Sequence, residues 1–110
     1  MNTSQITYLA GLLEGEGCFR INRFKRNPAW AYPEVIVGSI DLDVLKNAQR
    51  ISGVGRVYSR KLPDNPRHKQ CHIWEVTKTA EAHALMRSVL PYMGARRTAK
   101  IEEVLAETKG

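Results

Sequence analysis

Residues 9–17, Leu9-Ala10-Gly11-Leu12-Leu13-Glu14-Gly15-Glu16-Gly17, combine an apolar helical face with two glycines spaced four positions apart. Inside a helix each glycine costs roughly 0.5 to 1 kcal/mol relative to alanine, so Gly11 and Gly15 indicate that another backbone approaches closely. We therefore expect a second helix to pack against them, most simply the same helix of a symmetry-related copy of the chain.

Two carboxylates, Glu14 and Glu16, stand at the end of this helix, just before a helix stop at Gly17. An anion is disfavoured there by about 0.3 to 1 kcal/mol, because the end of the helix carries the negative pole of its dipole. A cationic group should offset this cost. If two copies pack through the glycines, their acidic ends meet and a divalent metal with oxygen ligands is the expected neutraliser. The alternative is an amphipathic helix with two solvated glutamates.

The same segment resembles the LAGLIDADG motif of the homing endonucleases. It matches the motif at Leu9, Ala10, Gly11, Leu12 and Gly17, with conservative replacements at Leu13, Glu14 and Glu16. The resemblance implies a homodimer whose interface is the first helix, through Leu9, Gly11, Leu12 and Gly15. It also implies that Glu16 is the acidic catalytic residue and metal ligand at the scissile phosphate, and that Glu14 has a capping or supporting role.

Composition is consistent with one nucleic-acid-binding domain over residues 1–110. The chain has 17 Lys and Arg against 11 Asp and Glu, a net charge of +6 that doubles in a homodimer. A basic balance of this size predicts a polyanionic partner. No apolar run approaches the roughly 20 residues of a membrane span, and no signal-peptide segment follows Met1, so we expect an intracellular protein and no membrane partner.

Cysteine and histidine raise one competing interpretation, a structural zinc ion. Cys18, His68, Cys71 and His72 offer four ligand atoms, but paired Cys-x-x-Cys arms are absent and the spacing fits no zinc pattern. We expect reduced thiols instead. His83 is expected to be an ordinary helical residue.

Hydrophobic periodicity predicts an α+β domain with the order αββαββα(α). The helices are expected at 5–16 with Thr3 or Ser4 as cap, from Asp41 or Asp43 to Gly53, from Thr79 to Pro91, and at 95–107. The strands are expected at 18–26, 32–39, 56–60 and 70–77, with a loop at Pro63–Pro66 between the last two. This order predicts a four-stranded antiparallel sheet with helices on one face only.

Successive side chains of these strands point to opposite faces of the sheet, and we expect no helix to cover the second face. Its expected residues are Arg20, Asn22, Phe24, Arg26, Ile36, Arg56, Tyr58, Arg60, Ile73 and Glu75. A curved basic sheet fits the major groove of double-stranded DNA, where Arg reads guanine and Asn reads adenine. These residues are therefore the predicted DNA contacts. The alternative is a merely polar exposed face.

The resemblance extends to two further catalytic positions. A water-positioning polar residue is implied at the end of the second strand, which is Ser39, and a basic residue after the third helix, which is Arg96 with Arg97 as the alternative. Magnesium or another divalent cation, held between Glu16, its dimer mate and phosphate oxygens, would activate water.

Taken together, these features predict a homing-type endonuclease of a mobile intron or intein that makes a metal-dependent double-strand cut at a long, near-palindromic DNA site. Two alternatives stay open. One is a non-cleaving DNA-binding module or RNA-splicing maturase of the same fold, with RNA as a possible partner. The other is an unrelated small basic domain that binds RNA or protein.

Overall fold

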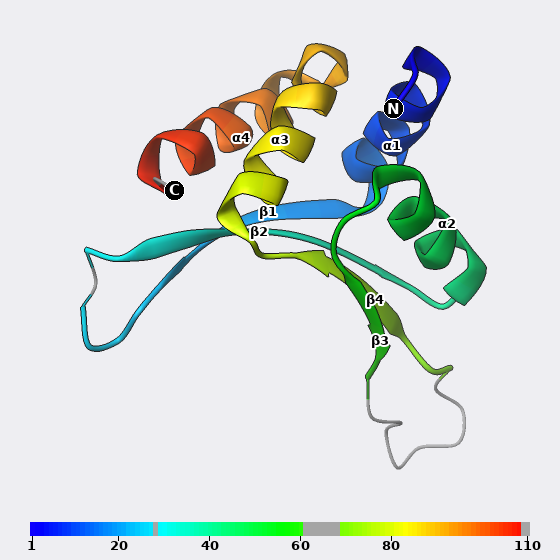
Figure 1. The fold of residues 1–110 in the computed structure, drawn as a ribbon, viewed down its shortest axis with the longest axis horizontal. Helices are drawn as coiled ribbons and strands as arrows, with labels where there is room; N and C mark the ends of the chain where they lie inside the picture. The colour runs from blue at the N-terminus through cyan, green and yellow to red at the C-terminus, as the bar shows by residue number, and fades with distance from the viewer. Residues whose placement is uncertain (28, 61–68, 109–110) are drawn as a thin grey trace.

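The computed structural model describes residues 1–27, 29–60 and 69–108. Along this part of the chain the elements are α1 (Thr3–Glu16), β1 (Gly17–Arg23), β2 (Ala31–Ser39), α2 (Leu42–Ser52), β3 (Arg56–Ser59), β4 (His72–Val76), α3 (Thr79–Val89), the short 3-10 helix η1 (Leu90–Tyr92) and α4 (Ala95–Glu107). The strands form one antiparallel sheet in the order β1-β2-β4-β3. All helices lie above the arched sheet, and its concave underside is uncovered (Figure 1). The predicted α+β architecture is confirmed.

The first helix begins earlier than expected. Its cap is Asn2, not Thr3 or Ser4: the Asn2 side chain accepts a hydrogen bond from the Gln5 amide at 2.8 Å, and the Gln5 side chain accepts one from the Asn2 amide at 2.9 Å. This reciprocal pair satisfies two amide groups that the first turn leaves free. Leu9, Ala10 and Leu13 then face the core and are buried.

The core lies between the sheet and the helices. The inward side chains of the strands are buried as predicted, among them Phe19, Val35, Val37, Trp74 and Val76. Their counterparts from the helices include Leu45, Leu85, Met86, Ile101 and Val104. The indole nitrogen of Trp74 donates to the Val54 carbonyl at 3.1 Å, so its polar atom is satisfied in the core.

Strand register divides the sheet into its two faces, since directly opposed residues point the same way. Arg20 pairs with Glu34, and Glu75 pairs with Ile36 on one side and Arg56 on the other. These residues share the underside, which we call the open face.

The hairpin that joins β1 and β2 differs from the prediction. The strand ends at Arg23 rather than at 26, because the Trp30 amide bonds to the Asn27 carbonyl at 2.9 Å and closes a turn. Phe24 and Arg26 therefore lie in the hairpin loop, not on the strand. The Phe24 ring packs against Trp30 and Tyr32, with ring centroids 6.4 and 5.4 Å apart.

Other boundaries shift by smaller amounts. Lys78, not Thr79, is the N-cap of α3. Arg60 lies just beyond β3, although its amide still donates to the Cys71 carbonyl at 2.9 Å. Gly53 ends α2 as predicted, with φ +71. The expected Pro63–Pro66 loop lies outside the described residues.

Glycine is required at position 55, between α2 and β3. Its φ is +83, and a Cβ there would lie 2.6 Å from the Glu75 carbonyl oxygen and from the Trp74 indole nitrogen. This close approach brings the start of β3 alongside β4, where Arg56 meets Glu75.

Candidate functional site

The acidic end of α1 is joined to the start of α4. Glu14 accepts a hydrogen bond from the Gly94 amide at 3.0 Å, and Gly94 is the N-cap of α4. Arg97 in the first turn of α4 reaches back: its Nη1 donates to the Gly17 carbonyl, and its Nε lies 3.8 Å from Glu14. The cation expected at this helix end is therefore Arg97, and Glu14 has the supporting role predicted for it.

This junction brings together the helix ends that carry Glu16 and Arg96. Glu16 is the last residue of α1, Arg96 lies in the first turn of α4, and both are exposed. Neither side chain makes a hydrogen bond or ion pair within the described residues, in contrast to Glu14 and Arg97. Beside Arg96 is a surface pocket of about 400 Å³ lined by Cys18, Phe19, Arg96, Arg97, Ala99, Lys100 and Glu103. The Glu14–Gly94 contact thus joins the two helices, and in the part of the chain that is described it leaves one carboxylate, Glu16, and one cation, Arg96, without a partner.

Ser39 is not part of this arrangement. It pairs with His72, so it faces the helix side of the sheet, and its Oγ accepts a hydrogen bond from the Asp41 amide at 3.0 Å, just before α2. The last residue of β2 on the open face is Gly38, opposite Ile73. The interpretation of Ser39 as a water-positioning residue needs correction, because an offset of one residue in a strand moves the side chain to the other face.

Charges on the open face are largely paired. The Glu75 carboxylate lies 2.6 Å from Arg56 Nη2, and Glu34 lies 3.7 Å from Arg20. Ile73 and Glu75 are on the predicted face but are only 1% and 8% exposed. These two side chains therefore contact neighbouring residues of the sheet and are little exposed to a bound partner.

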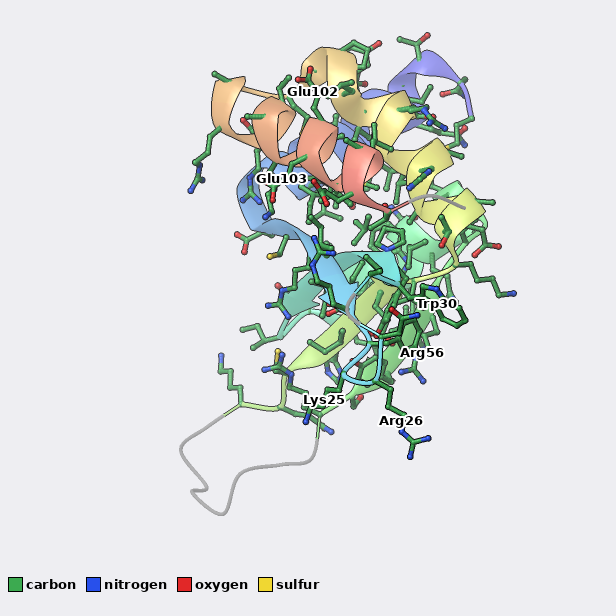
Figure 2. All side chains as sticks on the ribbon, turned by 90° about the vertical axis from the view of Figure 1, so that its left-hand side faces the viewer. Lys25, Arg26, Trp30, Arg56, Glu102 and Glu103 are labelled. Atoms are coloured by element: carbon green, nitrogen blue, oxygen red, sulfur yellow. The ribbon has the colours of Figure 1, made fainter. Side chains whose placement is uncertain are left out.

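Unpaired cations stand at the two hairpins instead. Lys25, Arg26, Arg60 and Lys69 are exposed, and their side chains make no hydrogen bond or ion pair in the part of the chain that is described. Lys25 and Arg26 lie at the lower end of the β1–β2 hairpin, far from Glu102 and Glu103 on α4 (Figure 2). Sequence reasoning missed Lys25, which the alternation of the predicted strand at 18–26 assigned to the other face, and Lys69, which precedes the strand predicted at 70–77.

The exposed side of α1 carries the glycines. No atom lies within 4 Å of a Cβ placed at Gly11 or Gly15, and the nearby Tyr8 is 42% exposed. Leu12 is partly buried at the edge of the core. Leu9 needs correction as an interface residue, because it is fully buried within its own chain.

Within the described residues, no group of three or more His, Cys, Asp or Glu side chains converges as a metal site. Of the zinc candidates, His68 lies outside those residues and the His72 Nδ1 pairs with Ser59 Oγ at 2.7 Å. The Cys18 sulfur accepts a hydrogen bond from Arg20 at 3.4 Å. No described helix is long and apolar enough to span a membrane.

Comparison with known proteins identifies the fold. The homing endonuclease I-CvuI in complex with its target is 22% identical, with a TM-score of 0.72 over 96% of this chain and 68% of that chain. The LAGLIDADG meganuclease I-AabMI bound to uncleaved DNA is 20% identical, with a TM-score of 0.70 over 93% of this chain and 34% of that chain. The archaeal intron-encoded homing endonuclease I-Vdi141I complexed with DNA is 15% identical, with a TM-score of 0.68 over 94% and 67%.

No protein-family model and no curated protein sequence matches the chain. The structural similarity is nevertheless consistent across these nucleases, and the chain has the fold of the LAGLIDADG homing endonucleases, as the resemblance of residues 9–17 implied.

Proposed function

We propose that this protein is a homing-type, site-specific endonuclease that binds double-stranded DNA as a homodimer and cuts both strands at a long, near-palindromic site. The observation that carries the proposal is the hydrogen bond from the Gly94 amide to Glu14, because it joins the helix ends bearing Glu16 and Arg96. Among the described residues neither of these side chains has a protein partner, which leaves both available to a substrate.

The DNA-binding part of the proposal rests on shape and charge. The open face is concave (Figure 1). Lys25 and Arg26 after β1, Arg60 after β3 and Lys69 before β4 are exposed and have no partner among the described residues. The net charge of +6 per chain, doubled in a dimer, favours a long polyanion. The structure of the similar nuclease I-CvuI is of a complex with its target, and that of I-Vdi141I is of a complex with DNA.

The homodimer is supported by α1. Gly11 and Gly15 leave open space on its exposed side, which allows the backbone of a second copy to approach. Such a contact would bring the two Glu16 carboxylates together and give a symmetric pair of sites, one for each strand.

Glu16 and its dimer mate are the residues that would hold Mg²⁺ or another divalent cation, and two converging carboxylates are suitable oxygen ligands. The bound cation would supply activated water and neutralise the charge that develops at the phosphate. Arg96 would donate hydrogen bonds to the phosphate oxygens, while Glu14 and Arg97 keep the helix ends in position. An endonuclease of this kind would act on DNA inside a microbial cell or an organelle. Its gene would lie in a mobile intron or intein.

The direct test is cleavage of supercoiled plasmid that carries the sequences flanking the host gene. The wild-type chain with Mg²⁺ should give linear product, and chelator should stop cleavage but not binding. Glu16→Gln should bind the plasmid insert normally and lose cleavage by orders of magnitude, whereas Glu14→Gln should lose much less. Wild-type cleavage rates for Glu16→Gln under single-turnover conditions would contradict the assignment and make Glu14 the next candidate.

A second function, a non-cleaving DNA-binding module or RNA-splicing maturase, is favoured by one observation. The Ser39 hydroxyl is engaged with the Asp41 amide and faces the helices, so the residue predicted to position water does not lie on the open face. A gel shift that persists in chelator, with no linear product at any Mg²⁺ concentration, would support this alternative. Binding to intron RNA in place of duplex DNA would identify the maturase.

A further inference from the structure

A buried carboxylate lies on the open face of the sheet, where no helix covers it. Glu75 in β4 is only 8% exposed, and Arg56 in β3 stands directly opposite. The Arg56 Nε donates to Glu75 Oε1 at 2.6 Å, and Arg56 Nη2 lies at the same distance from that oxygen. The second carboxylate oxygen accepts a hydrogen bond from the Tyr58 hydroxyl at 3.2 Å. The carboxylate is therefore fully occupied by two side chains of the neighbouring strand.

Tyr58 also contacts Arg56 directly. The Arg56 guanidinium carbon lies 4.7 Å from the centroid of the Tyr58 ring, so the ring stabilises the cation from one side. Burial and the negative charge of Glu75 raise the pKa of Tyr58 above its ordinary value. The hydroxyl therefore stays protonated and continues to donate to Glu75. Together the carboxylate and the ring restrict the conformations available to the arginine.

One edge of the Arg56 guanidinium is left for a partner. Its side chain is 72% exposed even though Nε and Nη2 are held by Glu75, and within the described residues Nη1 makes no hydrogen bond. The free edge consists of Nη1 and the remaining hydrogen of Nη2. Two parallel N–H donors in a rigid fork match the O6 and N7 acceptors of guanine in the major groove.

We infer that Arg56 reads a guanine in each half of the DNA site through this free edge, and that Glu75 is the positioning residue that orients it. The inference rests on the proposed function, because it requires duplex DNA on the open face. Arg56 and Glu75 together carry no net charge, so the pair contributes discrimination between bases, with little general attraction to phosphates. The Arg23–Glu107 pair, at 3.1 Å and outside the predicted DNA contacts, offers a matched control.

The experiment selects DNA from a pool of randomised duplexes with the full-length wild-type chain in chelator. The binding of the enriched site and of its single-base variants is then measured for R56K, E75Q, Y58F and R23K. R56K keeps the charge but loses the fork, so preference for guanine at one position of each half-site should fall roughly 5- to 150-fold. The salt dependence should not change, since the number of cations is the same.

E75Q should give a combination of effects that mere destabilisation cannot produce. Loss of the carboxylate frees one positive charge, so non-specific DNA should bind more tightly while preference at the same position falls. Y58F, which retains the ring, should reduce that preference less, and R23K should leave it unchanged. Thermal melting confirms that each variant is folded; R56K changes an exposed side chain and provides the test that does not depend on the core.

Three other outcomes would each contradict a particular part of the inference. A wild-type selection that enriches no sequence would contradict the proposed site-specific function, and with it this inference. An enriched site whose guanine preference is unaffected by R56K would overturn the role of Arg56 alone. Weaker binding of all sequences by folded E75Q, with unchanged preference, would overturn the positioning role of Glu75.

Discussion

Glu14 and Gly94, 80 residues apart in sequence, are joined by a 3.0 Å hydrogen bond from the Gly94 amide to the Glu14 carboxylate. The bond places a negative charge at the amino-terminal end of α4, where the helix dipole favours it. It also gives the two motif glutamates different surroundings. Glu14 is bound within the fold, whereas Glu16 is exposed and available to a ligand.

Stability should distinguish these two glutamates. Glu14→Ala removes the acceptor for the Gly94 amide and the neighbour of Arg97, so we expect the free energy of unfolding to fall by about 1 kcal/mol. Glu16→Ala should change it by less than about 0.5 kcal/mol, because that side chain is exposed. Urea unfolding followed by circular dichroism measures both. Equal losses would contradict the division of roles.

The association state should depend on Gly11. A Cβ at this position meets no atom from outside its own stretch of helix within 4 Å in the single chain, so the fold should persist in Gly11→Leu and the helix should gain propensity. Between two packed helices the same side chain would force the backbones apart. Analytical ultracentrifugation should therefore show a folded monomer for Gly11→Leu and a dimer for the wild-type chain. A folded variant with unchanged dimer mass would exclude this interface.

DNA affinity should fall steeply with salt. Each phosphate contacted by a lysine or arginine contributes about −0.9 to the slope of log affinity against log salt concentration. Replacement of Arg26 by Ala should make the slope less negative by about 0.9 per chain, which is the contribution of one phosphate contact. Fluorescence anisotropy of a labelled duplex measures it, with Arg23→Ala as the control, because Arg23 is paired with Glu107 at 3.1 Å. A slope near zero for the wild-type chain would mean that these cations do not meet phosphates.

Acid should destabilise the packing between α3 and α4. His83 is buried, its Nε2 lies 2.9 Å from Thr108 Oγ1, and burial, followed by the charge of Arg87, lowers its pKa below 6.5. The unfolded chain therefore binds the proton more readily, and stability should be highest above pH 6.5 and decline as the pH falls toward the lowered pKa. Melting temperatures at pH 7.5 and 5.5 should differ less for His83→Gln than for the wild-type chain. Identical pH dependence for both proteins would show that another group is responsible.

Much of the architecture follows from local patterns in the sequence. The alternation of Val35 and Val37 with Glu34 and Ile36 was enough to predict β2 and its buried face, because side chains of a strand point alternately to opposite sides. Gly53 was likewise sufficient to predict the end of α2, since a glycine adopts positive φ without strain. Hydrophobic periodicity and turn residues act over a few positions and are therefore visible in the chain itself.

Contacts between distant segments were not visible there. The face on which Ser39 lies, for example, depends on its pairing with His72, far along the chain. A shift of one residue along a strand moves a side chain to the opposite face of the sheet. The face of a residue at a strand end, such as Ser39, is therefore fixed by strand pairing and not by the local sequence.

The sequence by itself determined the order of helices and strands, the composition of the core, the basic charge and the motif at residues 9–17 that contains Glu16. Only the tertiary structure decided that Glu14 caps α4, that Arg97 neutralises the end of α1, and that buried Glu75 holds Arg56. The reason is physical: hydrophobic patterns are repeated locally, whereas hydrogen bonds and ion pairs need particular atoms within about 3 to 4 Å, and only the folded chain brings such atoms together.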